Sequence, residues 1–402
     1  MKMRLLIIMG IILFIICGIF LGNFIHEKSL ENTIDNTLFS VKDNNSIEVY
    51  SNKKITDFIY NLKGTLIDDF SIDINSLGKK EIIFSYNNES GHKRRGSFNI
   101  NVVDTTNPVI LLNDSYSVIV GYNKNLTDVI MSFDNYDSNP IREIIGEYDL
   151  NTPGTYNLEY RITDSSGNVT SKKFKLNVLK KDKNNLINES SYTSFKDVIS
   201  NYKNDNTCIG IDVSKWQGDI DFDKLKESGV EFVIIRIGTQ NGFDGEIIED
   251  IYFKNNIRKA KESGIDVGLY FYSYAKSKEE VLKQARWIVK KLDGMKLELP
   301  IAYDWESWNS FNTTNLSLYE FNELAHIFMD YLEKNGYKSM LYGSKYYLNN
   351  VFSTDKTIWL AHYTDKTDYE GKYYIWQMCN DGKVSGINGY VDIDILYKNE
   401  ED

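Results

Sequence analysis

The stretch Leu299-Pro-Ile-Ala-Tyr-Asp-Trp-Glu306 is a short apolar run that delivers two carboxylates, Asp304 and Glu306, two residues apart. In a β-strand, residues at i and i+2 point the same way, with a rise of about 3.3 Å per residue. Two acids held side by side suit glycosidic bond cleavage, since one protonates the leaving oxygen and the other stabilises the positive charge at the sugar carbon. The same pattern also occurs on solvated sheet rims, so the rest of the chain decides between these interpretations.

The sequence around this stretch alternates strand-like and helix-like segments. Apolar runs typical of buried strands occur at 208–213, 232–237, 267–272, 300–303 and 339–342. Amphipathic stretches lie between them, at 222–228, 252–263, 278–292 and 317–335, and each is followed by a glycine or ends close to one, as helix C-termini do. This repetition and its length predict a parallel α/β barrel. The segments 357–363, 373–378 and 390–395 leave no room for full helices, so we expect five regular units followed by three irregular ones.

In a barrel of this kind, the carboxyl ends of the strands build the site. Four acids and several aromatic or amide side chains are expected at these ends: Asp212, Asp304, Glu306, Asp392, Tyr270, Tyr272, Trp359, Tyr363, Trp376 and Gln377. Aromatic rings stack on the apolar faces of pyranose rings, so this set indicates a sugar site. Taken singly, an aromatic residue of this kind is more often part of the core than a ligand. Asp212 and Asp392 interrupt apolar strand ends, where an acid buried without a partner is costly.

Five motifs in order resemble the glycoside hydrolase family 25 lysozymes over nearly all of residues 207–398. They are Gly210-Ile-Asp-Val-Ser-Lys-Trp-Gln-Gly218, Phe232-Val-Ile-Ile-Arg-Ile-Gly238, Val267-Gly-Leu-Tyr-Phe-Tyr272, Leu299-Pro-Ile-Ala-Tyr-Asp-Trp-Glu306, and Trp376-Gln377 followed by Gly389-Tyr-Val-Asp392. The resemblance implies a modified TIM barrel, (β/α)5(β)3, and an N-acetylmuramidase that cuts the β-1,4 bond after N-acetylmuramic acid in bacterial peptidoglycan. Departures at 239–243 and at Met378-Cys379 put the subsite preference in doubt.

Carried over to this chain, the resemblance makes Glu306 the general acid and base. It makes Asp304 the residue that orients the substrate's 2-acetamido group, and Asp212 and Asp392 the two further acids of the site. Three neighbouring carboxylates are expected to raise the pKa of Glu306, as a proton donor requires. We therefore predict a substrate-assisted retaining reaction without metal or cofactor. An inverting reaction stays open, because carboxylate separation cannot be read from sequence.

The middle of the chain is an internal repeat. Asn52-Lys-Lys-Ile-Thr-Asp57 recurs as Asn123-Lys-Asn-Leu-Thr-Asp128, and Gly78 and Phe84 recur as Gly154 and Tyr160. The alternating pattern predicts β-hairpins with one buried face, hence two small β-sandwiches at 27–104 and 105–179. They resemble bacterial immunoglobulin-like (Ig-like) modules and are expected to form a stalk, with ligand binding as the alternative. Residues 180–206 have linker composition, which leaves 207–402 as the catalytic domain.

The N-terminus predicts a membrane anchor. Lys2 and Arg4 precede an apolar run from Leu5 to Leu21 that continues to Ile25, which is long enough to span a bilayer. By the positive-inside rule, residues 1–26 form a cytoplasmic stub and a transmembrane anchor, with a cleaved signal peptide as the alternative. We expect a single-pass protein of the cell membrane whose C-terminal domains lie on the cell-wall side.

Composition limits the remaining possibilities. The 402 residues suffice for two or three domains, and the net charge of −11 argues against a nucleic-acid partner. The three cysteines, Cys17, Cys208 and Cys379, form neither a disulfide framework nor a zinc spacing, although a single Cys208–Cys379 bridge stays open. The expected partners are peptidoglycan glycan strands and the membrane. The rival interpretations are a β-N-acetylglucosaminidase or chitinase-like hydrolase, and a non-catalytic wall-binding protein.

Overall fold

The computed structural model describes residues 2–31, 33–43, 45–181 and 192–398. The chain divides into two compact units, Met1–Thr106 and Asn107–Asp402. Residue 1 of the expected cytoplasmic stub, residues 182–191 of the expected linker and residues 399–402 of the expected catalytic domain lie outside the described residues.

The first unit begins with a long helix, α1 (Lys2–Leu30). Its stretch Met9–Leu30 has a mean hydropathy of 2.2 and is long and apolar enough to cross a membrane, a property that signal sequences share. A four-stranded sheet follows, in the order β2 (Ser46–Glu48), β6 (Lys93–Val103), β5 (Gly78–Asn88) and β4 (Gly64–Leu66). β1 (Ser40–Val41) pairs with β3 (Ile59–Tyr60), and η1 (Ile55–Asp57) lies just before β3. The rings of Phe84 and Phe98 pack together in the core of this unit.

The second repeat has the same plan. Its four-stranded sheet has the order β10 (Ile141–Ile145), β11 (Gly154–Thr163), β12 (Val169–Leu179) and β8 (Ser115–Ile119). β7 (Val109–Ile110) pairs with β9 (Ser132–Phe133), and the short helix α2 (Leu126–Val129) lies at the place of η1. Gly78 pairs with Val102 in the first repeat, and Gly154 pairs with Val178 in the second. The two repeats therefore share the register of their central hairpin.

The rest of the second unit is a closed ring of strands. β14 (Thr207–Val213), β15 (Phe232–Gln240), β17 (Asp266–Tyr272), β18 (Ile301–Asp304), β19 (Ser339–Ser344), β20 (Ile358–Ala361) and β21 (Ile375–Lys383) are parallel neighbours in that order. The last strand, β22 (Val391–Tyr397), runs antiparallel to both β21 and β14 and closes the ring. The short strand β16 (Ile247–Glu249) pairs with β15 outside the ring.

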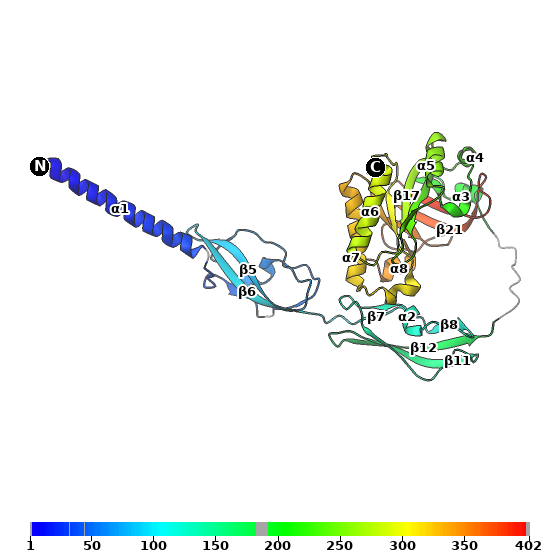
Figure 1. The fold of residues 1–402 in the computed structure, drawn as a ribbon, viewed down its shortest axis with the longest axis horizontal. Coiled ribbons are helices and arrows are strands. Elements are labelled where there is room, and N and C mark those ends of the chain that lie inside the picture. The colour runs from blue at the N-terminus through cyan, green and yellow to red at the C-terminus, as the bar shows by residue number, and fades with distance from the viewer. Residues whose placement is uncertain (1, 32, 44, 182–191, 399–402) are drawn as a thin grey trace. The chain divides into compact units, whose positions relative to one another are not determined.

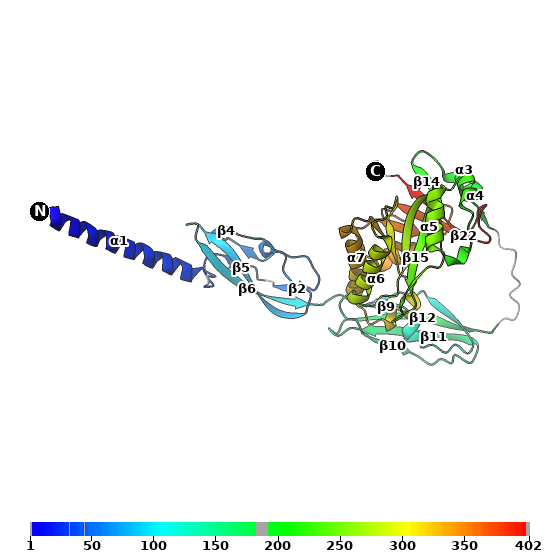
Figure 2. The same ribbon diagram turned by 45° about the horizontal axis from the view of Figure 1, so that its top comes forward.

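Helices cover the outside of this ring, as Figures 1 and 2 show for α5, α6 and α7. α4 (Phe222–Glu227), α5 (Phe253–Glu262), α6 (Lys278–Leu292), α7 (Leu318–Lys334) and α8 (Lys345–Asn350) follow the first five strands, with η2 (Lys215–Gln217) after β14 and η3 (Trp308–Thr313) after β18. The last two connections contain no helix among the described residues. Alternate residues of a strand serve two cores: Ile234 packs inside the ring and Ile235 packs against the helices. Burial on both faces explains why these strands are continuous apolar runs.

The structure differs from the sequence analysis after residue 191, where the residues up to 206 were expected to belong to a polar linker between domains. β13 (Thr193–Ser194) pairs with β21, and α3 (Phe195–Tyr202) buries Phe195 and Val198 in the outer core. The error arose because this helix is amphipathic but only eight residues long, so its polar side chains dominate the composition. Cys208 and Cys379 are free thiols, so the bridge left open by the sequence is not formed.

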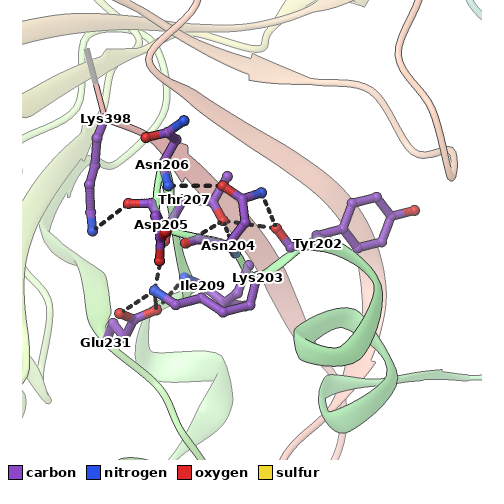
Figure 3. A network of polar contacts seen from close by, with 9 residues as sticks. All are labelled: Tyr202, Lys203, Asn204, Asp205, Asn206, Thr207, Ile209, Glu231 and Lys398. Carbon is purple, nitrogen blue, oxygen red and sulfur yellow. Dashed lines mark hydrogen bonds and ion pairs between the residues drawn. The ribbon is translucent and has the colours of Figure 1, made fainter. Parts of the chain in front are cut away.

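A polar network fastens α3 to the first and last strands of the ring (Figure 3). Lys203 Nζ lies 2.6 Å from a carboxylate oxygen of Glu231 and donates to the carbonyl of Thr207. The other Glu231 oxygen accepts from the amide of Ile209, and Lys398 Nζ donates to the carbonyl of Asp205. The segment 202–209 leads from α3 into β14. It is therefore held by Glu231, just before β15, and by Lys398, just after β22.

Replacing Phe195 by Ala tests whether α3 belongs to the fold. Phe195 is 2% exposed, so its truncation should lower the free energy of unfolding by about 3–5 kcal/mol, measured by chemical denaturation. The matched control, Lys196→Ala on the exposed side of the same helix, should change it by less than about 0.5 kcal/mol. Equal effects of the two substitutions would mean that α3 does not contribute to the core.

Candidate active site

The four predicted acids lie on two neighbouring parts of the ring. Asp304 is the last residue of β18, and Glu306 follows two residues later. Asp212 on β14 pairs directly with Asp392 on β22. The charge of Glu306 raises the pKa of Asp392, and Asp304 interacts directly with Glu306. The structure thus brings all four acids together, although they come from segments that are up to 180 residues apart in the sequence, between Asp212 and Asp392.

Asp304 and Glu306 interact as a pair in contrasting environments. Asp304 is 3% exposed and its Oδ1 has no hydrogen-bond partner, whereas Glu306 keeps an exposed face. Burial raises the pKa of both groups, and for Asp304 the charge of Glu306 adds to the rise. The interaction with Asp304 lowers the pKa of Glu306, so the expected cause, repulsion by neighbouring acids, is corrected to burial. Because both pKa values are raised, the pair retains a proton more readily than two isolated carboxylates do.

A fifth acid, Asp394, was missed by the sequence analysis. It is fully buried, and its Oδ1 accepts a hydrogen bond of 2.8 Å from the indole nitrogen of Trp359. Burial raises its pKa well above the ordinary value, with the charge of Asp392 as a further cause. Asp392 and Asp394 are two positions apart, as are Asp304 and Glu306. The same spacing could therefore have identified Asp394 in the sequence.

Asp212 and Asp392 differ in burial and in partners. Asp212 is 5% exposed, and its Oδ2 accepts a hydrogen bond of 2.8 Å from Gln377 Nε2. Burial, with the charges of Asp392 and Asp394, raises the pKa of Asp212 well above its ordinary value. Burial also raises the pKa of Asp392, to about 6, against a hydrogen bond with Asp212 that lowers it. This half of the site therefore also favours protonated carboxyl groups.

Gln377 connects this acid group to two tyrosines. Its Oε1 accepts hydrogen bonds from the hydroxyls of Tyr342, at 2.9 Å, and Tyr363, at 3.1 Å. Tyr363 is 52% exposed and is therefore available to a ligand, whereas Tyr342 is 8% exposed. Tyr342 was not predicted as a site residue, because a tyrosine in an apolar run is normally interpreted as a residue of the hydrophobic core.

A cleft of 370 Å³ opens beside Glu306. Its walls are mainly aromatic, and Trp308 stacks on Tyr347 with ring centroids 3.7 Å apart. The other lining residues include Trp305, Tyr342, Tyr346, His362 and Tyr363. An acid beside an aromatic cleft can bind a sugar ring and deliver a proton to it. Trp308, Tyr346 and Tyr347 were missed, although they directly follow two strand ends.

The other predicted aromatics lie in three different places. Tyr270 and Tyr272 are partly buried on β17, and the charge of Asp304 acts on both hydroxyls. Trp359 is 2% exposed inside the ring. Trp376 is not brought to the acids: it packs in the outer core against Tyr202, and its indole nitrogen donates to the carbonyl of His362. The reason is the strand period, since Trp376 and Gln377 are adjacent and must face opposite sides.

Among the described residues, the acids of this site are not grouped closely enough for three of them to share one metal ion. A reaction without metal or cofactor stays a prediction.

Replacing Asp394 by Asn tests the buried acid group through stability. Folding raises the pKa of Asp394 above its ordinary value of 3.8, so the folded chain holds a proton that the unfolded chain has released. The extra proton bound by the folded chain stabilises it at low pH, and this stabilisation is lost as the pH rises from the unfolded pKa through the folded pKa of Asp394. The neutral amide introduced by Asp394→Asn can still accept from Trp359, so the melting temperature of the variant relative to the unmodified protein should increase between about pH 4 and about pH 8. A relative melting temperature that decreases over this range would contradict the raised pKa.

Comparison with known proteins identifies the family. The family model "Glycosyl hydrolases family 25" matches residues 211–387. The chain is 30% identical over 189 residues to the autolytic lysozyme of Clostridium acetobutylicum, covering 46% of this chain and 54% of that protein. It is 30% identical over 201 residues to the uncharacterized protein YegX of Escherichia coli K12, covering 47% of this chain and 70% of that protein. The chain thus spans about half the length of the clostridial relative.

Solved structures of similar proteins include a family 25 glycosyl hydrolase from Bacillus anthracis, at 26% identity, a TM-score of 0.43 and coverage of 50% of this chain and 93% of that one. A spore cortex lytic enzyme from Clostridium perfringens is 21% identical, with a TM-score of 0.43 and coverage of 50% and 70%. The matched residues contain Asp212, Asp304 and Glu306, and the match stops before Asp392. The resemblance drawn from five motifs is therefore confirmed, and this chain belongs to family 25 of the glycosyl hydrolases.

Proposed function

We propose that the chain is a peptidoglycan hydrolase, a lysozyme that cleaves the β-1,4 bond after N-acetylmuramic acid. The observation that carries this proposal is the pair Asp304 and Glu306, one buried and one open to an aromatic cleft. Family membership supports the reaction class, and the name of the clostridial relative, an autolytic lysozyme, supports the substrate.

Glu306 is the general acid in this proposal. It gives its proton to the leaving glycosidic oxygen, while the carbonyl oxygen of the substrate's own 2-acetamido group attacks the anomeric carbon. The pair holds one proton, which is on Glu306, so Asp304 is ionised; it accepts a hydrogen bond from the acetamido N–H and balances the positive charge of the ring that forms. Glu306, now a carboxylate, removes a proton from water, and the water oxygen opens the ring with retention of configuration. The raised pKa of Glu306 supports its role as a proton donor.

The remaining residues bind and orient the glycan strand. Asp212 and Asp392 position the sugar from the opposite side of the site, with Gln377 holding Asp212 in place. Tyr270, Tyr272 and Tyr363 are available to contact sugar rings, whereas Trp359 supports Asp394 from inside. The order of strands and helices supports a modified (β/α)5(β)3 barrel for residues 207–402.

The N-terminal helix serves as the membrane anchor in this proposal. Residues 27–104 and 105–179 are then two Ig-like modules outside the cytoplasmic membrane, and the hydrolase acts on the adjacent cell wall. The length and apolar character of Met9–Leu30 support this location.

Product analysis tests the proposed bond specificity. Purified peptidoglycan is digested, the products are reduced with borohydride, and the reduced ends are identified by mass spectrometry. Muramitol ends are expected. Glucosaminitol ends would reassign the enzyme as a glucosaminidase, and no new reducing ends with the protein still bound to the wall would favour a binding protein.

Replacing Glu306 by Gln should abolish turnover while wall binding persists. The amide cannot supply the proton or later accept one, so the rate should fall by at least about 100-fold, measured as release of reducing ends. Glu279→Gln, at an exposed position in the first turn of α6, is the matched control and should retain full activity. Substantial activity in the Glu306 variant would refute its assignment as the general acid.

A further inference from the structure

The second repeat, residues 107–179, packs on the segment that follows Glu306 and is called the second module below. We propose that this module is a working part of the catalytic unit and holds the loop that carries Glu306, with Asn312 as the positioning residue. The proposal rests on the proposed function, because it assigns to Glu306 a position that matters for turnover.

Asn312 is the centre of the contact. It lies in η3, six residues after Glu306, and is 8% exposed. Its Nδ2 donates to the carbonyls of Thr127, at 2.7 Å, and Ile130, at 2.8 Å. Its Oδ1 accepts from the amide of Ser132 at 3.0 Å. These hydrogen-bonding groups that meet the side chain all belong to the second module.

The pocket around Asn312 is built for an amide. The two carbonyls belong to α2 and to its C-terminal cap, where carbonyl groups lack partners within the helix. The Ser132 hydroxyl is itself bonded to the hydroxyl of Tyr160 at 2.9 Å and to Arg142 Nε at 3.0 Å. Ser132, whose amide donates to Asn312, is thereby held by two further hydrogen bonds of its side chain.

Aromatic rings extend the contact towards the acids. Phe133 of the second module is 1% exposed and packs edge-on against Phe311, with centroids 5.9 Å apart. Phe311 packs in turn against Trp305 at 6.1 Å. Trp305 is fully buried and stands between Asp304 and Glu306 in the chain. The cores of the second module and the barrel are continuous here, since Phe133 and Trp305 belong to one apolar cluster.

The second module also provides hydrogen-bond acceptors for the first amides of α7, the helix that follows η3. The amide of Leu318 donates to the carbonyl of Asp134 at 2.8 Å, and the amide of Tyr319 donates to the carbonyl of Asn135 at 3.3 Å. Amides in the first turn of a helix have no partner within it. The second module therefore contacts the segment between Glu306 and α7 in its middle, at Phe311 and Asn312, and at its end, where α7 begins.

The consequence concerns the distance between the two acids. Asp304 is fixed in β18, but Glu306 lies in a short loop between β18 and η3. Movement of η3 shifts Glu306 relative to Asp304. Trp308, the η3 residue that lines the cleft, is held by its stacking on Tyr347 of α8, and the tyrosines of β17 stay in place. Misplacement of a reacting group by about 1 Å can cost roughly 100-fold in rate. Loss of the module contact should therefore lower kcat with little change in KM.

The test compares Asn312→Leu with Asn309→Leu in the full-length protein, kept in detergent. Asn309 lies on the same η3 and is exposed, so it is the matched control. The Asn312 variant should lose about 10- to 100-fold in kcat with KM within about twofold, and the control should keep both values. An unchanged kcat in a folded Asn312 variant, or a raised KM alone, would overturn the positioning role.

Two further variants keep the test decisive if Asn312→Leu does not fold. Asn312→Asp keeps the shape and the acceptor for Ser132 but turns an oxygen towards two carbonyls, so the same loss of kcat is expected. Phe133→Ala removes the contact from the module side, and combining it with Asn312→Asp should cost less than the sum of the two single effects. Full additivity would mean that the two residues do not act through one contact.

Hydrogen exchange separates this proposal from the proposed function. The amides of residues 305–317 should exchange faster in either Asn312 variant than in the Asn309 control, whether or not peptidoglycan is the substrate. Equal exchange would overturn the docking. Faster exchange in a protein that releases no reducing ends from peptidoglycan would leave the docking intact and refute the muramidase assignment instead.

Discussion

Closure of the ring by an antiparallel last strand is the constraint on which the site depends. β22 pairs with β14 on one side and β21 on the other, and this pairing sets Asp392 opposite Asp212 and Asp394 opposite Gln377. If β22 ran parallel to β14, Asp392, which is the second residue of β22, would lie at the other end of the ring from Asp212, which is next to the last residue of β14. The buried carboxyl groups are thus placed by the backbone pairing of β22 with its two neighbours.

The fold was largely readable because parallel barrel strands are buried on both faces and therefore appear as unbroken apolar runs, as in 232–237. The carboxylate pair was predicted from two acids two residues apart at a strand end; only Asp304 belongs to β18, and Glu306 lies in the loop just beyond it. The direction of β22 could not be predicted from the sequence, because it depends on pairing with β14, which lies almost 200 residues earlier. Trp376 was misplaced for a simpler reason: two adjacent strand residues, Trp376 and Gln377, cannot both face the same side.

Polar composition was misleading where a short segment is held by a few buried residues. Phe195 and Val198 suffice to dock α3, although the residues around them are polar. Similarly, nothing in the pattern 308–313 signals that Asn312 is buried by another domain, because its partners are backbone groups of the second module. Contacts made to backbone groups leave no trace in the partner's side chains, so they escape reading from a single sequence.

The two repeats share the register of their hairpins but differ in a hydroxyl group. Tyr160, which fixes the Ser132 hydroxyl, corresponds to Phe84 in the first repeat, and phenylalanine has no group to donate or accept there. The first copy has an apolar ring without a hydroxyl at this position, whereas in the second copy the hydroxyl of Tyr160 is bonded to Ser132, whose amide donates to Asn312 of the barrel. Two repeats with the same hairpin register can therefore differ, through one hydroxyl group, in the contacts that they are able to support.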